Sequence, residues 1–133
     1  MINSEIYKVV GLLKPVSLST ATTGSAVAIQ LFEDDCVAVL QTGAFAGTTP
    51  TVSVTIEAST TSATGYVTVG TFTATALTTG GEAAVGVNLA GQKYVRAKIA
   101  MSSADTTTVV PISVCLFGQL DYEASNINSP IVA

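Results

Sequence analysis

Histidine and tryptophan are both absent from this 133-residue chain, and only 11% of its residues are charged. The absence of histidine removes the commonest general base and the commonest zinc ligand. Phosphate-binding loops, dinucleotide-binding glycine motifs and the G-x-S-x-G nucleophile motif are missing as well. The sequence therefore predicts a protein that is not an enzyme and that holds no cofactor and no metal.

Basic residues are also scarce, since five lysines and arginines stand against nine acidic residues and give a net charge of −4. Nucleic-acid binding depends on many Lys and Arg contacts to phosphates, so we expect no nucleic-acid partner. The apolar run Val109–Phe117 is interrupted by Pro111 and Ser113 and is far shorter than the roughly 20 residues of a membrane helix. Glu5 stands where a secretion signal would carry positive charge. We therefore expect no membrane association, and synthesis and assembly in the cytoplasm.

Apolar residues make up 48% of the chain, and they are spread over short segments in which they alternate with polar residues. Alternation is typical of a β-strand, whose side chains point to opposite faces in turn. The clearest case is Thr51–Ala58, where one face carries Val52, Val54 and Ile56. Residues 36–40 are apolar on both faces, as expected for a central buried strand. Related patterns predict strands over residues 6–13, 26–32, 36–40, 51–58, 66–73, 84–89, 94–101 and 108–117.

These segments predict an all-β fold: a single β-sandwich, either a jelly roll or another Greek key, of about eight short antiparallel strands with little or no helix. The length indicates one domain over residues 1–133, with an N-terminal arm over 1–25 and an irregular C-terminal tail over 119–133. We expect a turn at Glu33–Asp35 and a bulge or bend at Gly70. Loops are expected over residues 15–25, 43–50 and 75–82.

The segment Gly91–Gly118 contains two strands joined by a polar stretch. Tyr94–Met101 places Val95, Ala97 and Ile99 on one face, and the run Thr108–Phe117 has the same alternation. Residues 102–107 between them are polar and show no helical period. We therefore expect an antiparallel hairpin with a long loop.

Cys36 and Cys115 both lie among apolar residues, which predicts two reduced thiols packed in the core. A disulfide is the alternative, and it would need Cα atoms about 4.4–6.8 Å apart. The acidic triplet Glu33–Asp35 is the only local arrangement that resembles a metal site. Because it lacks the alternating oxygen ligands of a calcium loop, we interpret it as a solvated turn.

Three of the five basic residues, Lys93, Arg96 and Lys98, lie on the predicted strand that carries Tyr94. They either form a strip that contacts an acidic partner surface or simply occupy the solvent face of an amphipathic strand. Loops often carry binding in sandwich folds, and the loops over 43–50 and 75–82 contain Phe45 and Glu82. The candidate interface therefore comprises Lys93, Tyr94, Arg96, Lys98, Phe45 and Glu82.

Two stretches of the chain resemble one family of viral proteins. The run Thr23–Val27 is followed by a Glu-Asp turn and an apolar strand, and Gly91–Arg96 is followed by an apolar strand that ends at Gly118. This pattern, over residues 24–118, resembles the head decoration (capsid cement) proteins of tailed bacteriophages. The region after Gly43 departs from it, because it is rich in Thr and Ala and lacks the aromatic and charged residues of that family.

The resemblance implies a jelly-roll or β-sandwich domain that forms a homotrimer and binds the major capsid protein on the outer surface of the virion. A weakly charged chain that must cover its surface agrees with such an assembly role. Three alternatives stay open: a tail or head-fibre component, a self-assembling coat protein, and a carbohydrate-binding module. The last usually stacks sugars on exposed aromatic residues, and only 6% of this chain is aromatic.

Overall fold

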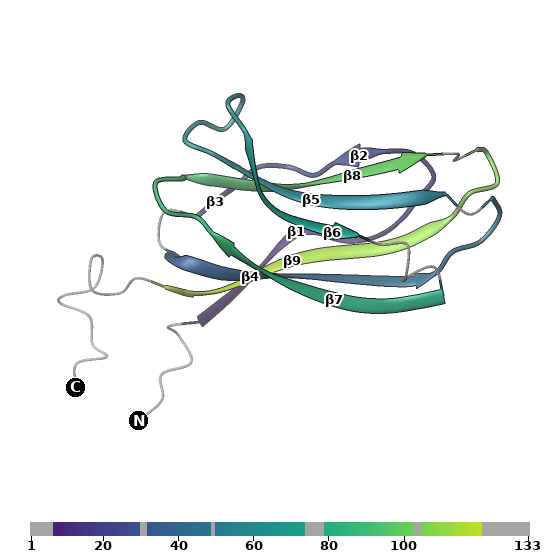
Figure 1. Ribbon diagram of the computed structural model, residues 1–133, viewed down its shortest axis with the longest axis horizontal. Coiled ribbons are helices and arrows are strands. Elements are labelled where there is room, and N and C mark those ends of the chain that lie inside the picture. Colours follow the sequence, from purple (N-terminus) through teal and green to yellow (C-terminus); the bar gives the residue numbers. More distant parts are fainter. Residues whose placement is uncertain (1–6, 30–31, 49, 74–78, 103–104, 121–133) are drawn as a thin grey trace.

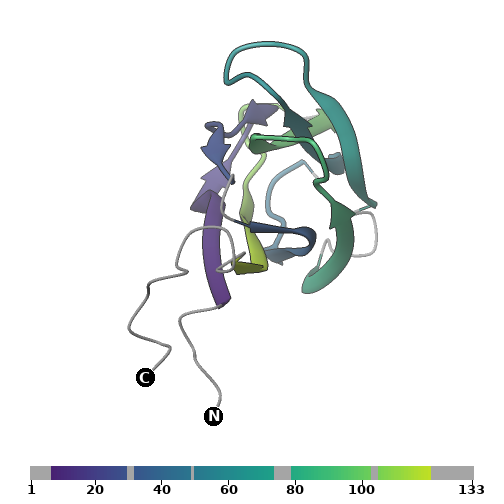
Figure 2. The same cartoon turned by 90° about the vertical axis from the view of Figure 1, so that its left-hand side faces the viewer.

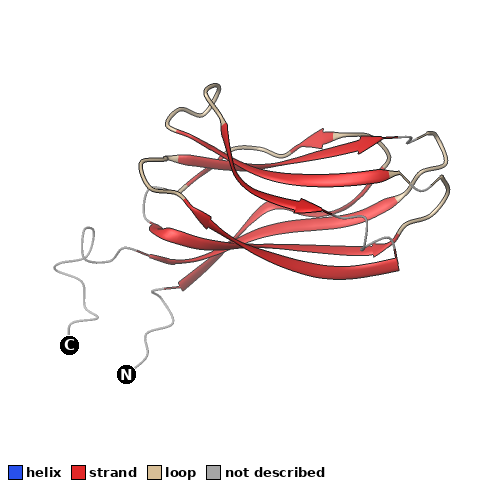
Figure 3. Ribbon diagram, in the orientation of Figure 1, coloured by secondary structure: helices blue, strands red, loops and turns tan. Residues whose placement is uncertain are grey.

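The computed structural model describes residues 7–29, 32–48, 50–73, 79–102 and 105–120. Throughout these residues the chain is all-β and contains no helix (Figures 1 and 3). Two antiparallel sheets pack face to face, and the end view in Figure 2 shows them as separate layers. The predicted β-sandwich is therefore confirmed.

Nine strands build the two sheets. One sheet has the order β1-β9-β4-β7, and the other has the order β2-β8-β5-β6, with β3 also paired to β8. We call them the four-stranded and the five-stranded sheet. The strands are β1 (Tyr7–Leu18), β2 (Thr22–Thr23), β3 (Val27–Ala28), β4 (Phe32–Ala44), β5 (Thr51–Ser59), β6 (Val67–Thr73), β7 (Thr79–Asn88), β8 (Tyr94–Ser102) and β9 (Val110–Leu120).

The pairing of the strands is nested. β1 pairs with β9, the short strands β2 and β3 both pair with β8, β4 pairs with β7, and β5 pairs with β6. Each early strand thus meets a late one, and β2 and β3 act as two pieces of one interrupted edge strand. A double-layered sandwich with this nested pairing is a jelly roll.

The core lies between the sheets and consists of the inward side chains of alternate strand positions. Burial of such an aliphatic side chain stabilises the fold by about 1.5–3 kcal/mol. Most of the residues predicted to face inward are buried, which confirms the alternation found in the sequence. They include Val52, Val54, Ile56, Val95, Ala97, Ile99, Val110, Ile112, Val114 and Leu116.

The predicted hairpin over residues 94–117 is wrong, although both of its strands exist. β8 belongs to the five-stranded sheet and β9 to the four-stranded sheet, so the connection crosses from one layer to the other. Both strands send their apolar side chains into the same core from opposite sides. We call this connection between the two sheets the arch. Apolar and polar side chains alternate in the same way in the strands of a hairpin and in strands joined by such an arch. The polar connection is long enough to span the roughly 10 Å between packed sheets.

The arch is fixed to the loop that follows β4. Thr48 donates a hydrogen bond from Oγ1 to the carboxylate of Asp105, and the Thr107 backbone N–H donates to Asp105 Oδ1 at 2.8 Å. Thr108 Oγ1 donates to the Thr48 carbonyl oxygen at 2.8 Å. Gly47 lies against this network with φ +73°, and a Cβ there would collide with the Thr107 carbonyl. The two loops therefore form one hydrogen-bonded unit at this end of the sandwich.

The expected N-terminal arm and the loop over 15–25 are both wrong for most of their length. β1 runs through Pro15 to Leu18 and pairs with β9, with register shifts between Gly11 and Val16. Proline is tolerated here because β1 is an edge strand and is irregular at this point. At the other end, Gln119 belongs to β9 rather than to an irregular tail. The remainder of that tail, residues 121–133, lies outside the described residues.

Two further expectations about turns are wrong. The acidic triplet Glu33–Asp35 lies within β4, where the Leu89 backbone N–H donates to the Asp34 carbonyl at 2.7 Å. An irregular register before Cys36 explains why the sequence there looks like a turn. Likewise, the loop expected over 75–82 is already strand from Thr79 onward, while residues 75–78 lie outside the described residues.

The expected strand over 26–32 is shorter than predicted, since β3 covers only Val27–Ala28. The bulge expected at Gly70 is confirmed. Gly70 is opposite Ile56 and Thr68 is opposite Glu57, so one extra residue interrupts the pairing of β6 with β5.

Candidate functional site

The predicted basic strip lies on the outer face of the five-stranded sheet. Tyr94, Arg96 and Lys98 occupy alternate positions of β8, and Lys93 directly precedes the strand. Lys93 and Lys98 are exposed, whereas Tyr94 and Arg96 are half-buried. Tyr94, Arg96 and Lys98 therefore share one face of the sheet, and Lys93 is exposed at the position before the strand.

Arg96 has internal partners. Its Nε lies 2.9 Å from Glu57 Oε1 on β5, and its guanidinium stacks 3.7 Å from the centroid of the Tyr66 ring. The Glu57 side chain is only 13% exposed, so the ion pair is partly shielded from water. A cation over an aromatic face adds a favourable electrostatic contact. Arg96 thus holds β8 to its neighbours, and the exposed positive charge of the strip comes from Lys93 and Lys98.

Phe45 and Glu82 lie elsewhere. Phe45 follows β4 and packs, half-buried, against the core, so its side chain contributes mainly to the fold. Glu82 is exposed on β7, opposite Gln41, in the four-stranded sheet. The six candidate interface residues therefore do not form one continuous surface.

The two cysteines point to opposite faces of the four-stranded sheet. Cys36 is buried in the core, as predicted, and its pKa is raised by burial and, to a lesser extent, by the negative charges of Asp35 and Asp34. Cys115 is half-buried on the outer face, so the expected core position is wrong for this residue. Its side chain points to the opposite face from that of the next residue, Leu116, which points inward. Neither cysteine forms a disulfide.

Acidic side chains do not assemble into a metal site within the described part of the chain, where no three His, Cys, Asp or Glu residues gather. Asp34 and Asp35 are both exposed, and Asn88 Nδ2 donates to Asp35 Oδ1 at 3.2 Å. Over the same residues, no helix is long and apolar enough to cross a membrane.

The outer face of the four-stranded sheet carries a surface that sequence reasoning missed. Val9, Phe117 and Val37 are direct cross-strand neighbours on β1, β9 and β4, and they are 59%, 41% and 39% exposed. This row continues to Gly86 on β7. The next outward row consists of Gly11, Cys115, Val39 and Ala84. We call these eight residues the apolar face; it crosses all four strands and contains no charge.

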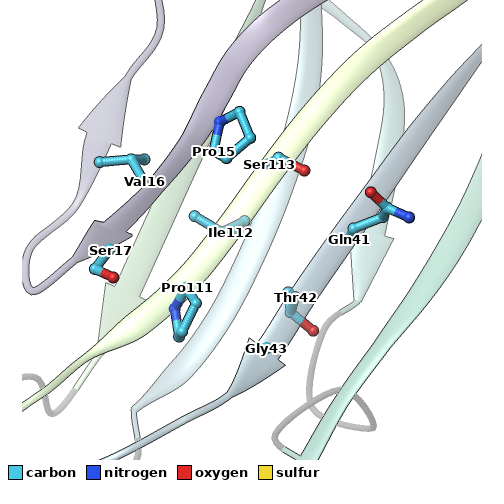
Figure 4. Close-up of a pocket in the computed structure, with 9 residues that line it drawn as sticks. All are labelled: Pro15, Val16, Ser17, Gln41, Thr42, Gly43, Pro111, Ile112 and Ser113. Carbon is cyan, nitrogen blue, oxygen red and sulfur yellow. The ribbon is translucent and has the colours of Figure 1, made fainter.

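The same surface becomes hollow near the beginning of β9 (Figure 4). The hollow measures about 670 Å³, and residues of β1, β9 and β4 line it. Gly43 contributes no side chain, and a Cβ there would approach Pro111 to 3.1 Å. The lining residues are Pro15, Val16, Ser17, Gln41, Thr42, Gly43, Pro111, Ile112 and Ser113.

A signal for the apolar face was present in the sequence. Residues 36–40 are apolar on both faces, which we interpreted as a strand buried on both sides. β4 is indeed a central strand, but its outward Val37 remains exposed in the single chain. A strand that is apolar on both faces indicates a second covered surface, and here nothing within the chain's described residues covers it fully.

No family profile and no curated protein matches the chain. Among solved structures, it is similar to the infectious bursal disease virus VP2 subviral particle (TM-score 0.55, 14% identity, 87% of this chain and 33% of that chain). It is similar to a structure of the Gx strain of the same virus (0.52, 12%, 93% and 33%). It is also similar to the insecticidal delta-endotoxin Cry8Ea1 from Bacillus thuringiensis (0.51, 11%, 80% and 19%). The chain spans a third or less of each of these proteins, and the likeness establishes the sandwich fold.

Proposed function

We propose that the chain is a virion structural protein that decorates the outer surface of a phage head. The observation that carries the proposal is a jelly-roll sandwich with a charge-free apolar outer face, which suits contacts between proteins rather than chemistry. The fold occurs in the VP2 subviral particle, and the sequence over residues 24–118 resembles head decoration proteins. Since one fold hosts many functions, the fold supports this role by analogy.

The proposed mechanism needs neither catalysis nor a cofactor. The protein is made in the host cytoplasm, binds the major capsid protein from outside, and buries surface between neighbouring capsid subunits. Each added contact must break before the subunits separate, so the shell resists internal pressure better. An acidic chain on the outside lies away from the packaged nucleic acid.

We propose that the exposed lysines of the five-stranded sheet face the shell. Lys93 and Lys98 provide positive charge on an otherwise acidic protein, and Tyr94 lies beside them. Rim charges of this kind guide association with an acidic surface more than they determine its final strength.

The test mixes the purified chain with empty, expanded heads of the phage that encodes it and follows co-sedimentation and the temperature of head disruption. We expect binding and a higher disruption temperature. The double variant Lys93→Glu, Lys98→Glu should bind at least about tenfold more weakly, because two attractive charges become repulsive. The matched control Lys8→Glu, Lys14→Glu changes the net charge equally on β1 and should bind like the wild type.

Other outcomes identify the alternatives. A folded chain that binds no heads contradicts the proposal. Binding to tails or fibres supports a fibre component, spontaneous formation of closed particles supports a coat protein, and binding that a glycan competes away supports a carbohydrate-binding module.

A further inference from the structure

The apolar face is an interaction surface with a particular internal symmetry. We propose that it binds the same face of a second copy of this chain, forming a two-fold dimer with antiparallel strands across the interface. This inference concerns the isolated protein and does not depend on its proposed role on a head.

Charge favours a second copy at this place. Two copies of a chain with net charge −4 repel each other, and this repulsion opposes contact least at a surface whose centre carries no acid. The eight residues of the apolar face contain none. The adjacent outward positions on β4 are Asp35 at one end and Gln41 at the other, and on β7 they are Asn88 and Glu82.

A two-fold axis that lies in the interface, between the two rows and parallel to them, makes this face complementary to itself. Rotation about this axis reverses the strand direction. Each strand therefore lies over the same strand of the partner, and each row lies over the partner's other row. Phe117 and Val9 then lie over the smaller Cys115 and Gly11 of the partner, while Val37 lies over the partner's Val39. On β1 and β9 large side chains thus meet small ones, as close packing favours.

The same operation pairs the polar ends. Asp35 lies over the partner's Gln41, and Glu82 lies over the partner's Asn88, so each carboxylate meets an amide that can donate a hydrogen bond. On neither of these two strands does an acid lie directly over an acid of the partner. Twist keeps packed sheets within about 30° of alignment, which preserves these pairings near the axis.

The available area agrees with a dimer of modest strength. Four strands spaced by about 4.8 Å, over the length from Asp35 to Gln41 at about 3.4 Å per residue, give a face of about 460 Å². Two such faces bury about 900 Å², which lies below the roughly 1,200–2,000 Å² of stable specific interfaces and in the range of weak ones. We therefore expect a monomer–dimer equilibrium that dilution can shift.

The test measures the mass of the purified full chain by sedimentation equilibrium over a wide concentration range. We expect a dimer that dissociates on dilution. Val37→Asp places a charge in the centre of the interface and should weaken the dimer at least about tenfold. Thr71→Asp is the matched control, because it adds the same charge to the outer face of β6 in the other sheet; it should dimerise like the wild type.

A second measurement locates the contact. Cys115 lies beneath the partner's Phe117 in the dimer, so its reaction with a maleimide should slow as the concentration rises. Phe117→Ser should remove this protection, and circular dichroism verifies that each variant is folded. Because Cys36 is buried, Cys115 dominates the reaction in the folded protein.

Several results would overturn the proposal. They are a monomer at every concentration, equal loss of the dimer in Val37→Asp and Thr71→Asp, or a trimer such as the resemblance to decoration proteins implies. A chain that dimerises only after deletion of residues 121–133 would also overturn it, since the tail, and not a second copy, would then cover the face. None of these results bears on binding to heads, so the two proposals fail separately.

Discussion

The outer faces of the two sheets differ much more than their inner faces do. Inside, both sheets present the same small aliphatic side chains to one core. Outside, the five-stranded sheet carries threonines, lysines and the Arg96–Glu57 pair, whereas the four-stranded sheet carries the apolar face. The inner faces explain why the chain folds. The outer faces differ in the contacts that each could make, because one is charged and polar and the other is apolar.

The largest expected effect separates the two faces of a single strand. Leu116→Ala removes a fully buried side chain from β9 and should lower the free energy of unfolding by about 2–5 kcal/mol. Phe117→Ser changes the next residue, on the outer face, and should lower monomer stability by less than about 1 kcal/mol. Urea unfolding at concentrations that dissociate the dimer measures both. Equal losses would show that Phe117 belongs to the core of the monomer and that the apolar face is not a separate surface.

A smaller effect is expected on the polar outer face. Glu57→Gln removes the charge that pairs with Arg96 and should destabilise the fold by about 0.5–1 kcal/mol, because the pair is only partly shielded. Concentrated salt should reduce the difference from the wild type, since salt screens the ion pair. The matched variant Glu82→Gln alters an exposed acid on the other sheet, and we expect its unfolding curve to match the wild type. A comparable loss there would show that the two outer faces do not differ in this way.

The smallest expected effect concerns the arch that links the two sheets, because Asp105 is exposed to solvent. Hydrogen bonds from Thr48 and Thr107 lower the pKa of Asp105 to about 2, from a reference value of 3.8. A carboxylate with a lowered folded-state pKa stabilises the fold above the reference value and loses this contribution as the pH falls toward 2. Asp105→Asn should therefore weaken the fall in stability between pH 4 and pH 2.

Thr48→Val should act in the same direction by removing one donor, and acid titrations followed by circular dichroism compare the three proteins. Identical pH profiles would mean that the arch contributes no acid-sensitive stability.

Much of the fold could be predicted because alternation reports directly which side chains face a core. Val95–Ile99 and Val110–Leu116 show this pattern, and it placed their buried side chains correctly. Alternation cannot report which strands share a sheet, so it predicts a hairpin where the chain in fact crosses from β8 in one sheet to β9 in the other. The low strand propensities of Pro15 and of the acidic triplet predict breaks, yet the pairing of β1 with β9 and of β4 with β7 outweighs those propensities.

The candidate interface was only partly predictable for a related reason. Lysines and arginines are conspicuous in a chain with so few charges, so Lys93, Arg96 and Lys98 attracted attention. The apolar face consists of ordinary strand residues from four segments that are distant in sequence. Val9, Val37 and Phe117 become one surface only when β1, β4 and β9 are placed side by side with a known register.

The nested pairing also affects how the chain is completed during synthesis. β9, the last strand among the described residues, lies between β1 and β4, which are made early. Until β9 arrives, those two strands have open edges facing a gap in the middle of their sheet, and open edges invite aggregation. A product that terminates before Val110 would therefore lack a central strand rather than a peripheral one. The topology therefore makes completion of the four-stranded sheet depend on translation through β9.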